Sequence, residues 1–511
     1  MKKLRLIICL LLGFCLFSKA QFKEIAASRE FNEPYSGSTK LLLMKNGNLI
    51  LADVGFKDSI RIRIYNAAHQ EIAVTSYEMA KPDKRKYSGL RAAFEINGEV
   101  VLFIATEEEK TETLYRVIVD PNSGQVKKEE KILSLKPLPK NEMYALWWGN
   151  LSISKGVESD DYAIVFCNNF RSDKVKEIGV LLFNKEHVET GRSFYETAEK
   201  EFESLKLIGL SLTGPEKAAL LLVGSPWKDG DRKMFLALTK KGSSALTIIE
   251  QKFPEEKLPR DSKLFYNSYS KKLVLAAVCV CNEKRDNKYL YMIDPESGKT
   301  EKKINYAFNN AFHEKGEDIY GRKYLPLGAP MNLLVDKHGN FSVIYRADGT
   351  ISTSSGASTY STALEFTVAD FDIDGKLLNN YLIPRKIVIN PNSNFGDSYE
   401  AYAYIKNSDR AFLFFNDHRE NIERLEKNKD PKQVIVVKDC DAFYFPLTGN
   451  NVLPARKYLY KETDDREEHI QFSYGAACVY DKENDIFITV RLNRDEKKRT
   501  KSVNVVWLKP Q

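Results

Sequence analysis

Short apolar runs recur along the whole chain, and each is flanked by polar turns or charged connections. The eight clearest runs begin at Asn48, Glu99, Tyr162, Lys217, Lys272, Asn340, Arg410 and Asp485. Short runs that are continuously apolar and β-branched are typical of strands buried on both faces. A short buried helix would give a similar run. The turn sequences Asn46-Gly47 and Asn97-Gly98, directly before two of the runs, favour β-hairpins instead.

Each of these runs is the second strand of a repeating unit, and a third strand follows it after a charged connection. The third strands are expected at Ile60–Tyr65, Leu114–Val119, Ile178–Phe183, Met234–Leu238, Tyr289–Ile293, Leu364–Val368, Val434–Val437 and Val503–Trp507. Nearly the same turn follows two of them, at Asp120–Gly124 and Asp294–Gly298. Pro and Gly set the dihedrals of such turns, and Asp binds its own downstream backbone. A more polar fourth strand completes the unit.

The units are evenly spaced. Seven intervals of about 62 residues separate the first run from the last, so eight units fill the chain. A four-stranded antiparallel unit cannot bury both of its faces alone, and neighbouring units must therefore pack together, as the blades of a β-propeller do. We predict an all-β fold with a single β-propeller of eight four-stranded blades. Seven blades, or a pair of β-sandwich domains, are the alternatives.

The two ends of the chain complement one another. The eighth unit stops at Trp507–Lys509, after its third strand. The segment Phe22–Phe31 is a strand without a unit of its own, and it resembles the fourth strand of the first unit, Gln70–Tyr77. We therefore expect the N-terminal strand to complete the last blade and close the ring, which leaves only short, protected edges.

Four segments interrupt the repeat. The Ser/Thr-rich segment Thr350–Thr362 predicts a flexible loop inside unit six, and the charged insertion Asp417–Lys432 in unit seven has room for a short helix. Asn305–Pro330 and Pro384–Tyr399 are long connections between units. Loops of this length are either functional or merely mobile.

The first twenty residues have the pattern of a secretory signal peptide. A basic start precedes the apolar run Leu6–Phe17, and Ser18-Lys19-Ala20 provides small residues for cleavage before Gln21. The run is too short to cross a bilayer, which needs about 20 residues. No later apolar run reaches 18 residues, so no transmembrane segment is expected. Residues 1–20 are thus a predicted signal peptide, and residues 21–511 are expected to form the propeller of an exported protein, either periplasmic or extracellular.

Cleavage changes the charge of the chain. The net charge is +7; residues 1–20 contain four basic residues and no acidic one, so +3 remains on the mature chain. This balance points to no nucleic-acid partner. Five cysteines remain after cleavage, an odd number that leaves at least one free thiol.

Two features of the chain, the signal peptide and the repeat, resemble a known group of proteins. On these two features alone, the chain resembles the uncharacterised exported propeller-like proteins of the Bacteroidota. The resemblance implies export and a propeller fold, and it implies no activity, ligand or site residue.

Three motifs imitate ligand sites, and in each case the spacing favours a simpler interpretation. Ser297–Thr300 ends like a phosphate-binding loop, but Ile293 stands where the first Gly is needed, so a hairpin turn is expected. Asp370–Gly375 begins like a calcium loop, yet Tyr381 stands where a bidentate Glu is required. Cys279 and Cys281 share one strand face without further soft ligands and are expected in the core. No metal or cofactor is predicted.

Aromatic and basic residues cluster just before first strands. In a propeller, these connections share one face with the loops between second and third strands, where ligands commonly bind. The candidate ligand-binding residues are Arg91, Trp147, Trp148, Arg322, Tyr324, Tyr399 and His469. Rings beside Arg suit stacking and hydrogen bonding to a sugar or a peptide. The alternative is that these residues pack one blade against the next.

Function follows only in outline. The chain contains no GxSxG elbow and no zincin motif. We therefore expect a module that recognises a protein or glycan partner through its loop-rich face. The alternatives are a hydrolase or lyase with a channel-mouth active site built from several blades, and a structural component of the cell envelope. The oligomeric state stays open.

Overall fold

The computed structural model of the protein describes most of the chain beyond residue 21. It covers residues 22–32, 37–55, 59–80, 85–108, 110–137, 151–168, 174–199, 201–226, 231–254, 258–282, 285–321, 328–352, 359–389, 402–407, 410–434, 439–447, 452–460, 469–495 and 500–510. The predicted signal peptide and its cleavage site lie outside these residues. Within the described ranges, no helix has the length and apolar character needed to cross a membrane.

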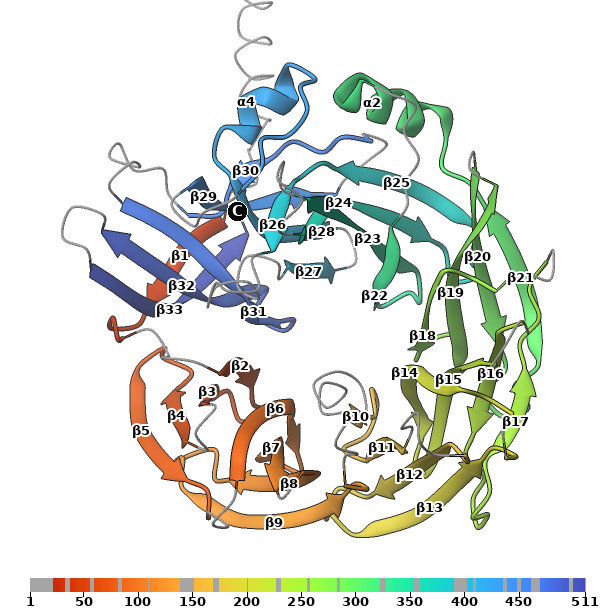
Figure 1. Ribbon diagram of the computed structural model, residues 1–511. Coiled ribbons are helices and arrows are strands. Elements are labelled where there is room, and N and C mark those ends of the chain that lie inside the picture. The colour runs from red at the N-terminus through yellow and green to blue at the C-terminus, as the bar shows by residue number, and fades with distance from the viewer. Residues whose placement is uncertain are drawn as a thin grey trace, which may run out of the picture.

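The strands form eight antiparallel sheets around a central axis, so the predicted eight-bladed β-propeller is confirmed (Figure 1). Blade 1 contains β2 (Ser38–Leu43), β3 (Leu49–Val54), β4 (Ser59–Tyr65) and β5 (Glu71–Glu78). Blade 2 contains β6 (Arg85–Ile96), β7 (Glu99–Glu108), β8 (Thr111–Val119) and β9 (Val126–Ser134). Blade 3 contains β10 (Leu151–Lys155), β11 (Tyr162–Asn168), β12 (Glu177–Phe183) and β13 (Glu189–Glu196). Blade 4 contains β14 (Ser204–Gly214), β15 (Lys217–Ser225), β16 (Lys233–Leu238) and β17 (Thr247–Glu250).

The second half of the ring repeats the same order. Blade 5 contains β18 (Asp261–Asn267), β19 (Lys272–Asn282), β20 (Arg285–Ile293) and β21 (Thr300–Tyr306). Blade 6 contains β22 (Ala329–Val335), β23 (Phe341–Ser352), β24 (Thr359–Phe371) and β25 (Leu377–Ile383), with β26 (Ile387–Ile389) also paired to β24. Blade 7 contains β27 (Tyr402–Asn407), β28 (Arg410–His418), β29 (Cys440–Pro446) and β30 (Lys457–Tyr458). Blade 8 contains β31 (His469–Asp481), β32 (Ile486–Asp495), β33 (Thr500–Pro510) and β1 (Phe22–Ala27).

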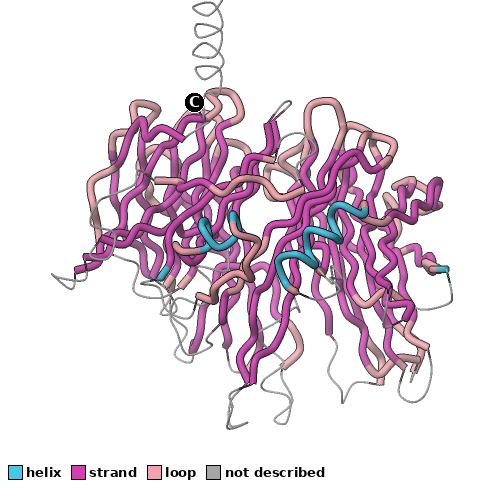
Figure 2. The backbone as a smooth tube through the Cα atoms, turned by 90° about the horizontal axis from the view of Figure 1, so that it is seen from above, coloured by secondary structure: helices cyan, strands magenta, loops and turns pink. Residues whose placement is uncertain are grey.

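Helices occur only as additions to this ring in the described residues. They are α2 (Asn310–Tyr320), in the connection between blades 5 and 6, and α4 (Asn421–Glu426), in the charged insertion of blade 7. Both lie at the outer rim in Figure 1, and strands are the main component of the described backbone in Figure 2. The Ser/Thr-rich segment of blade 6 is strand for part of its length, because Ser352 pairs with Thr359.

The apolar second and third strands build the core between blades. Eight clusters of buried side chains each join at least two neighbouring blades and follow one another around the ring, the last joining blade 8 to blade 1. Every sheet is therefore covered on both faces. This is why the second strands are apolar throughout, without the alternation of a half-exposed strand.

The repeated Asp-to-Gly turns also contribute to blade packing. The Asp120 carboxylate accepts hydrogen bonds from the amides of Asn122 and Ser123, and Asp294 makes the same bonds in blade 5. Gly298 has φ 66°, and a Cβ there would lie 2.2 Å from Ile249 Cδ1 of the preceding blade. Both the left-handed backbone and the close approach require glycine. The predicted hairpin at Ser297–Thr300 is confirmed.

One predicted strand is wrong. The third strand of blade 7 is β29, at Cys440–Pro446, and not Val434–Val437. Val434 instead makes a single parallel bridge with Ile387 of blade 6. The insertion that contains α4 delays the return of the chain to the sheet, and Val434 packs where the insertion meets the neighbouring blade.

The N-terminal strand closes the ring as predicted. β1 pairs with β33 from Phe22↔Pro510 to Ala27↔Val506, and Phe31 bridges Val503 beyond it. The Phe22 ring makes edge-to-face contacts with Phe412, Phe414 and Tyr444 of blade 7, at centroid distances of 5.1, 5.2 and 5.0 Å. The first strand is thus held by backbone pairing to blade 8 and by side-chain packing to blade 7.

Replacing Phe22 should weaken this closure. Phe22 is only 6% exposed, and removing a buried ring costs about 3 kcal/mol or more. We expect Phe22→Ala to lower the free energy of unfolding by about that amount and to lower the melting temperature measured by calorimetry. Ile25→Ala is the matched control, because Ile25 lies on the same strand and is 40% exposed; its effect should stay under about 0.5 kcal/mol. Equal effects of the two variants would contradict closure through Phe22.

Candidate binding site

The two ends of the propeller differ in their connections. Because the strands of each blade are antiparallel, the tight turns between first and second strands lie at the same end as the turns between third and fourth strands. The connections between blades lie at the other end, together with the loops between second and third strands. We call these the tight-turn end and the loop end.

A cavity lies on the axis at the tight-turn end. Its volume is about 1060 Å³, which is the size of a site for a small molecule or a short polymer segment. The first strands β10, β14, β18 and β22 form its wall, and the turn after β31 completes it. Five of the eight blades therefore contribute to one cavity.

Exposed apolar and aromatic side chains stand at the mouth of the cavity. Tyr269, in the turn after β18, is 53% exposed, and Val157, in the turn after β10, is 66% exposed. Phe265, Tyr266 and Tyr480 line the cavity as well. Exposed apolar groups gathered at a concave site typically mark a binding surface.

The turn of blade 3 crosses the mouth of this cavity. It is longer than the Asn-Gly turns of blades 1 and 2 and runs from Gly156 to Asp161. Its Glu158 forms an ion pair with Lys271 of blade 5 at 2.5 Å, and its Asp160 forms one with Lys45 of blade 1 at 3.0 Å. The turn thus contacts two blades that are not its neighbours in the ring.

Asp160 anchors the turn. Its carboxylate also binds Lys155 at 2.9 Å and accepts a hydrogen bond from the Asn97 amide at 3.0 Å. Burial alone would raise the pKa of Asp160, but the hydrogen bonds from Lys155 and Lys45 outweigh burial and lower the pKa to about 2. Asp160 is therefore ionised at any physiological pH.

The carboxylates that line the cavity are engaged in structural contacts. Glu158 is paired with Lys271, and Asp336 accepts hydrogen bonds from the amides of His338 and Asn340 in the turn after β22. Among the described residues, no group of three or more His, Cys, Asp or Glu is arranged to hold a metal ion. These contacts suit binding better than acid–base chemistry, which needs a carboxyl or imidazole group available to the ligand.

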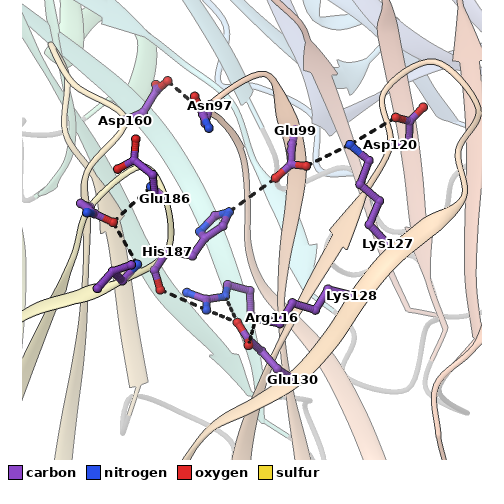
Figure 3. A network of polar contacts seen from close by, with 12 residues as sticks. Asn97, Glu99, Arg116, Asp120, Lys127, Lys128, Glu130, Asp160, Glu186 and His187 are labelled. Carbon is purple, nitrogen blue, oxygen red and sulfur yellow. Dashed lines mark hydrogen bonds and ion pairs between the residues drawn. The ribbon is translucent and has the colours of Figure 1, made fainter.

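A second polar cluster joins blades 2 and 3 (Figure 3). The Arg116 guanidinium binds the Glu130 carboxylate. It also binds the Tyr162 hydroxyl, and Tyr162 Oη lies 3.2 Å from His187 Nδ1. His187 Nε2 faces Glu99 at 3.8 Å. The types of residue would suit proton transfer, but Arg116, Tyr162 and His187 are nearly or fully buried between the blades. We interpret the cluster as a polar contact that fixes blade 3 against blade 2.

The structure describes little of the site expected from sequence. Trp147, Trp148, Arg322, Tyr324 and Tyr399 lie outside the described residues. His469 begins β31, and its side chain is also outside them.

Arg91 is the one candidate whose side chain is described. It lies at a bulge in β6 and forms an ion pair with Glu112 at 2.6 Å. Burial raises the pKa of Glu112, although the Arg91 charge acts against this. This contact within blade 2 fits packing, and a ligand role for the seven residues stays a prediction.

Sequence reasoning did not find the axial cavity. Its lining comes from five blades, and the sequence placed ligands at the loop end. The one available signal was the unusual length of the blade 3 turn, between the strands that end at Lys155 and begin at Tyr162.

Comparison with known proteins shows only distant likeness. No protein-family model and no curated protein matches the chain. Three solved structures match over most of its length. The match to the WD40 domain of SCAP from fission yeast covers 96% of this chain and 91% of that domain, with 8% identity and TM-score 0.30. The match to the β-propeller domain of the Trilobed protease from Pyrococcus furiosus covers 83% of this chain and 94% of that domain, with 12% identity and TM-score 0.35. The match to polysaccharide lyase Uly1 covers 85% of this chain and 93% of that protein, with 9% identity and TM-score 0.42. At these values the likeness does not extend to function.

The cluster of Figure 3 predicts a pH dependence of stability. Burial and the nearby Arg116 charge lower the pKa of His187 below its usual 6.5. Between the lowered value and 6.5, the unfolded state binds a proton that the folded state does not, so stability is lost as the pH falls below about 6.5. His187 has φ 65°, which Asn tolerates. We therefore expect His187→Asn to reduce the difference in melting temperature between pH 7.5 and pH 5.5.

The neighbouring Val188 provides the control for this variant. It is 57% exposed and does not titrate, so Val188→Asn should leave the pH dependence of the melting temperature as in the unmodified protein. A His187→Asn protein with the full original pH dependence would show that His187 does not contribute.

Proposed function

We propose that the protein is an exported ligand-binding module and that its axial cavity at the tight-turn end holds a carbohydrate. Export is supported by the sequence of residues 1–20, and binding by the cavity that five blades form. This places the ligand at the opposite end from the aromatic and basic cluster expected from sequence.

One observation carries the proposal, namely the concave mixed lining of the cavity. Tyr266, Tyr269 and Tyr480 are aromatic members of the lining, the Tyr480 hydroxyl being bound to Asp485, and Lys155 and Ser154 add polar groups to it. Sugars present apolar C–H faces and a rim of hydroxyls, so rings and hydrogen-bonding groups together match them. The blade walls are held by cores on both faces, so the cavity is formed before the ligand arrives.

A hydrolase or lyase built at the channel mouth is the alternative function. It would need a carboxyl, tyrosyl or imidazole group free to transfer a proton. Glu158 and Asp336 are occupied in the contacts described above. We therefore favour binding without turnover, and incubation with ligand followed by chromatography of the products separates the two functions.

The proposal predicts a specific loss of affinity. Tyr269→Ala removes the most exposed ring at the mouth, and an aromatic contact contributes roughly 0.5–1.5 kcal/mol beyond its buried area. The measurement is isothermal titration calorimetry with a panel of neutral and acidic oligosaccharides. For the oligosaccharide that binds best, we expect the dissociation constant to rise roughly three- to tenfold in the variant.

Val188→Ala is the matched control for this measurement. Val188 has nearly the same exposed fraction as Tyr269, 57% against 53%, but it lies in a turn of blade 3 outside the cavity lining. Its replacement should leave the affinity unchanged. If no oligosaccharide of the panel binds, or if Tyr269→Ala binds as well as the unmodified protein, the proposed site is wrong.

A further inference from the structure

Cations without acidic partners line the axial cavity. Lys263 projects from β18, Lys337 lies in the turn after β22, and Lys482 lies in the turn after β31. Within the described part of the chain, none of these three lysines forms an ion pair. They come from blades 5, 6 and 8, so the positive charge surrounds the axis on several sides.

The same charge continues towards the loop end. A second cavity of about 270 Å³ lies between blades 4 and 5, and Lys263 lines both cavities. Lys206 of β14 and Arg232, just before β16, line this second cavity. Neither has an acidic partner among the residues that the structure describes. Lys263, Lys206 and Arg232 therefore extend the positive charge along the wall of blades 4 and 5, beyond the mouth where Lys337 and Lys482 of blades 6 and 8 lie.

The acidic groups near this path are already neutralised or engaged. Glu158 is paired with Lys271, and Asp261 is paired with Arg260 at 2.6 Å. Asp336 is held by the amides of its own turn. Lys155, the remaining cation of the lining, is paired with Asp160. The lining of the axial cavity thus contains four lysines and two carboxylates, an excess of positive charge.

Unpaired charge in a concave site is unfavourable without a ligand. Lys263 lines both cavities and has no acidic partner among the described residues, and burial lowers the pKa of its ammonium group. A cleft lined by charges of one sign also concentrates ions of the opposite sign. An anion in the cavity would restore the lost solvation and form charge-assisted hydrogen bonds.

We propose that the axial cavity binds an acidic oligosaccharide, whose carboxylate or sulfate groups contact Lys263 and the lysines of the mouth. This inference rests on the proposed carbohydrate function and names its ligand class. The tyrosines decide for a sugar over an acidic peptide: a ring of Tyr266 or Tyr269 packs on the C–H face of a pyranose while the acidic substituent reaches an ammonium group.

The test compares four probes of equal length on the purified protein. They are hexagalacturonate, a sulfated hexasaccharide, a neutral galactan hexamer and a hexaglutamate peptide. We expect one of the two acidic sugars to bind at least tenfold more tightly than the neutral sugar and the peptide. The carboxylated and sulfated probes distinguish the two kinds of acidic group. Because screening shortens the range of charge interactions, from about 10 Å at 0.1 M to about 3 Å at 1 M salt, this binding should weaken steeply with salt.

Two variants locate the binding. Lys263→Gln removes the charge and leaves a polar side chain that is one atom shorter. It should weaken binding of the acidic sugar about tenfold, as the loss of one charge-assisted hydrogen bond implies. The double variant Lys337→Gln with Lys482→Gln should weaken it at least as much. Lys240→Gln is the control, because Lys240 is an exposed lysine in the turn between β16 and β17, outside the cavity; it should bind as the unmodified protein does.

The outcomes separate the two proposals. If the neutral sugar binds as well as the acidic sugars and Lys263→Gln has no effect, the cavity binds carbohydrate but the acidic class is wrong. If the hexaglutamate peptide binds most tightly, the partner is an acidic protein segment and the inference is overturned. If no sugar binds at all, the proposed carbohydrate function itself fails. Circular dichroism and melting of each variant confirm that it is folded.

Discussion

Every other feature of this molecule depends on the pairing of β1 with β33. A propeller blade exposes two apolar faces, so a ring with one incomplete blade would leave a core open to water on each side of the gap. β1 supplies the missing fourth strand of blade 8, while Phe22 inserts among Phe412, Phe414 and Tyr444 of blade 7. One short segment therefore joins two blades and the two ends of the chain, and the remaining seven blades need no special device beyond their repeated pattern.

Closure also creates the site. The first strands have no neighbour on the axial side, and only a complete ring brings those of blades 3, 4, 5 and 6 around one cavity. The long turn of blade 3 then spans the mouth through Glu158–Lys271 and Asp160–Lys45. Both lysines are largely exposed, and exposed ion pairs of this kind contribute little to stability. The ring fixes the wall of the cavity, whereas weak contacts position the segment that crosses its entrance.

Sequence reasoning reached the fold because the repeat is local. Each unit repeats an apolar run, as after Asn46-Gly47, and two units repeat the same turn, at Asp120 and Asp294. The number of blades and the closure of the ring followed from the spacing of these repeats. It failed for the third strand of blade 7, expected at Val434–Val437: Val434 bridges Ile387, and the strand is β29. The cavity was beyond its reach for a different reason. Lys263, Lys337 and Lys482 are far apart in the sequence, and the residues around them form no recognisable motif. Only the closed ring brings them to one axis. The expected site at the loop end stays untested, since Arg91 alone has a described side chain.

The distribution of charge matters more here than its total. A net charge of +3 after the predicted cleavage gives no reason to expect a charged ligand, because a total does not show where the cations lie. Lys263, Lys337 and Lys482 are set apart by their place around one cavity. The acids beside them are engaged, Glu158 in an ion pair and Asp336 in its own turn. Holding Lys263 there against desolvation opposes folding. Burial of the eight cores between blades stabilises the fold far more than desolvation of Lys263 destabilises it. The ring can therefore hold an excess of positive charge at its axis. A ligand of opposite charge gains most binding energy at such a place.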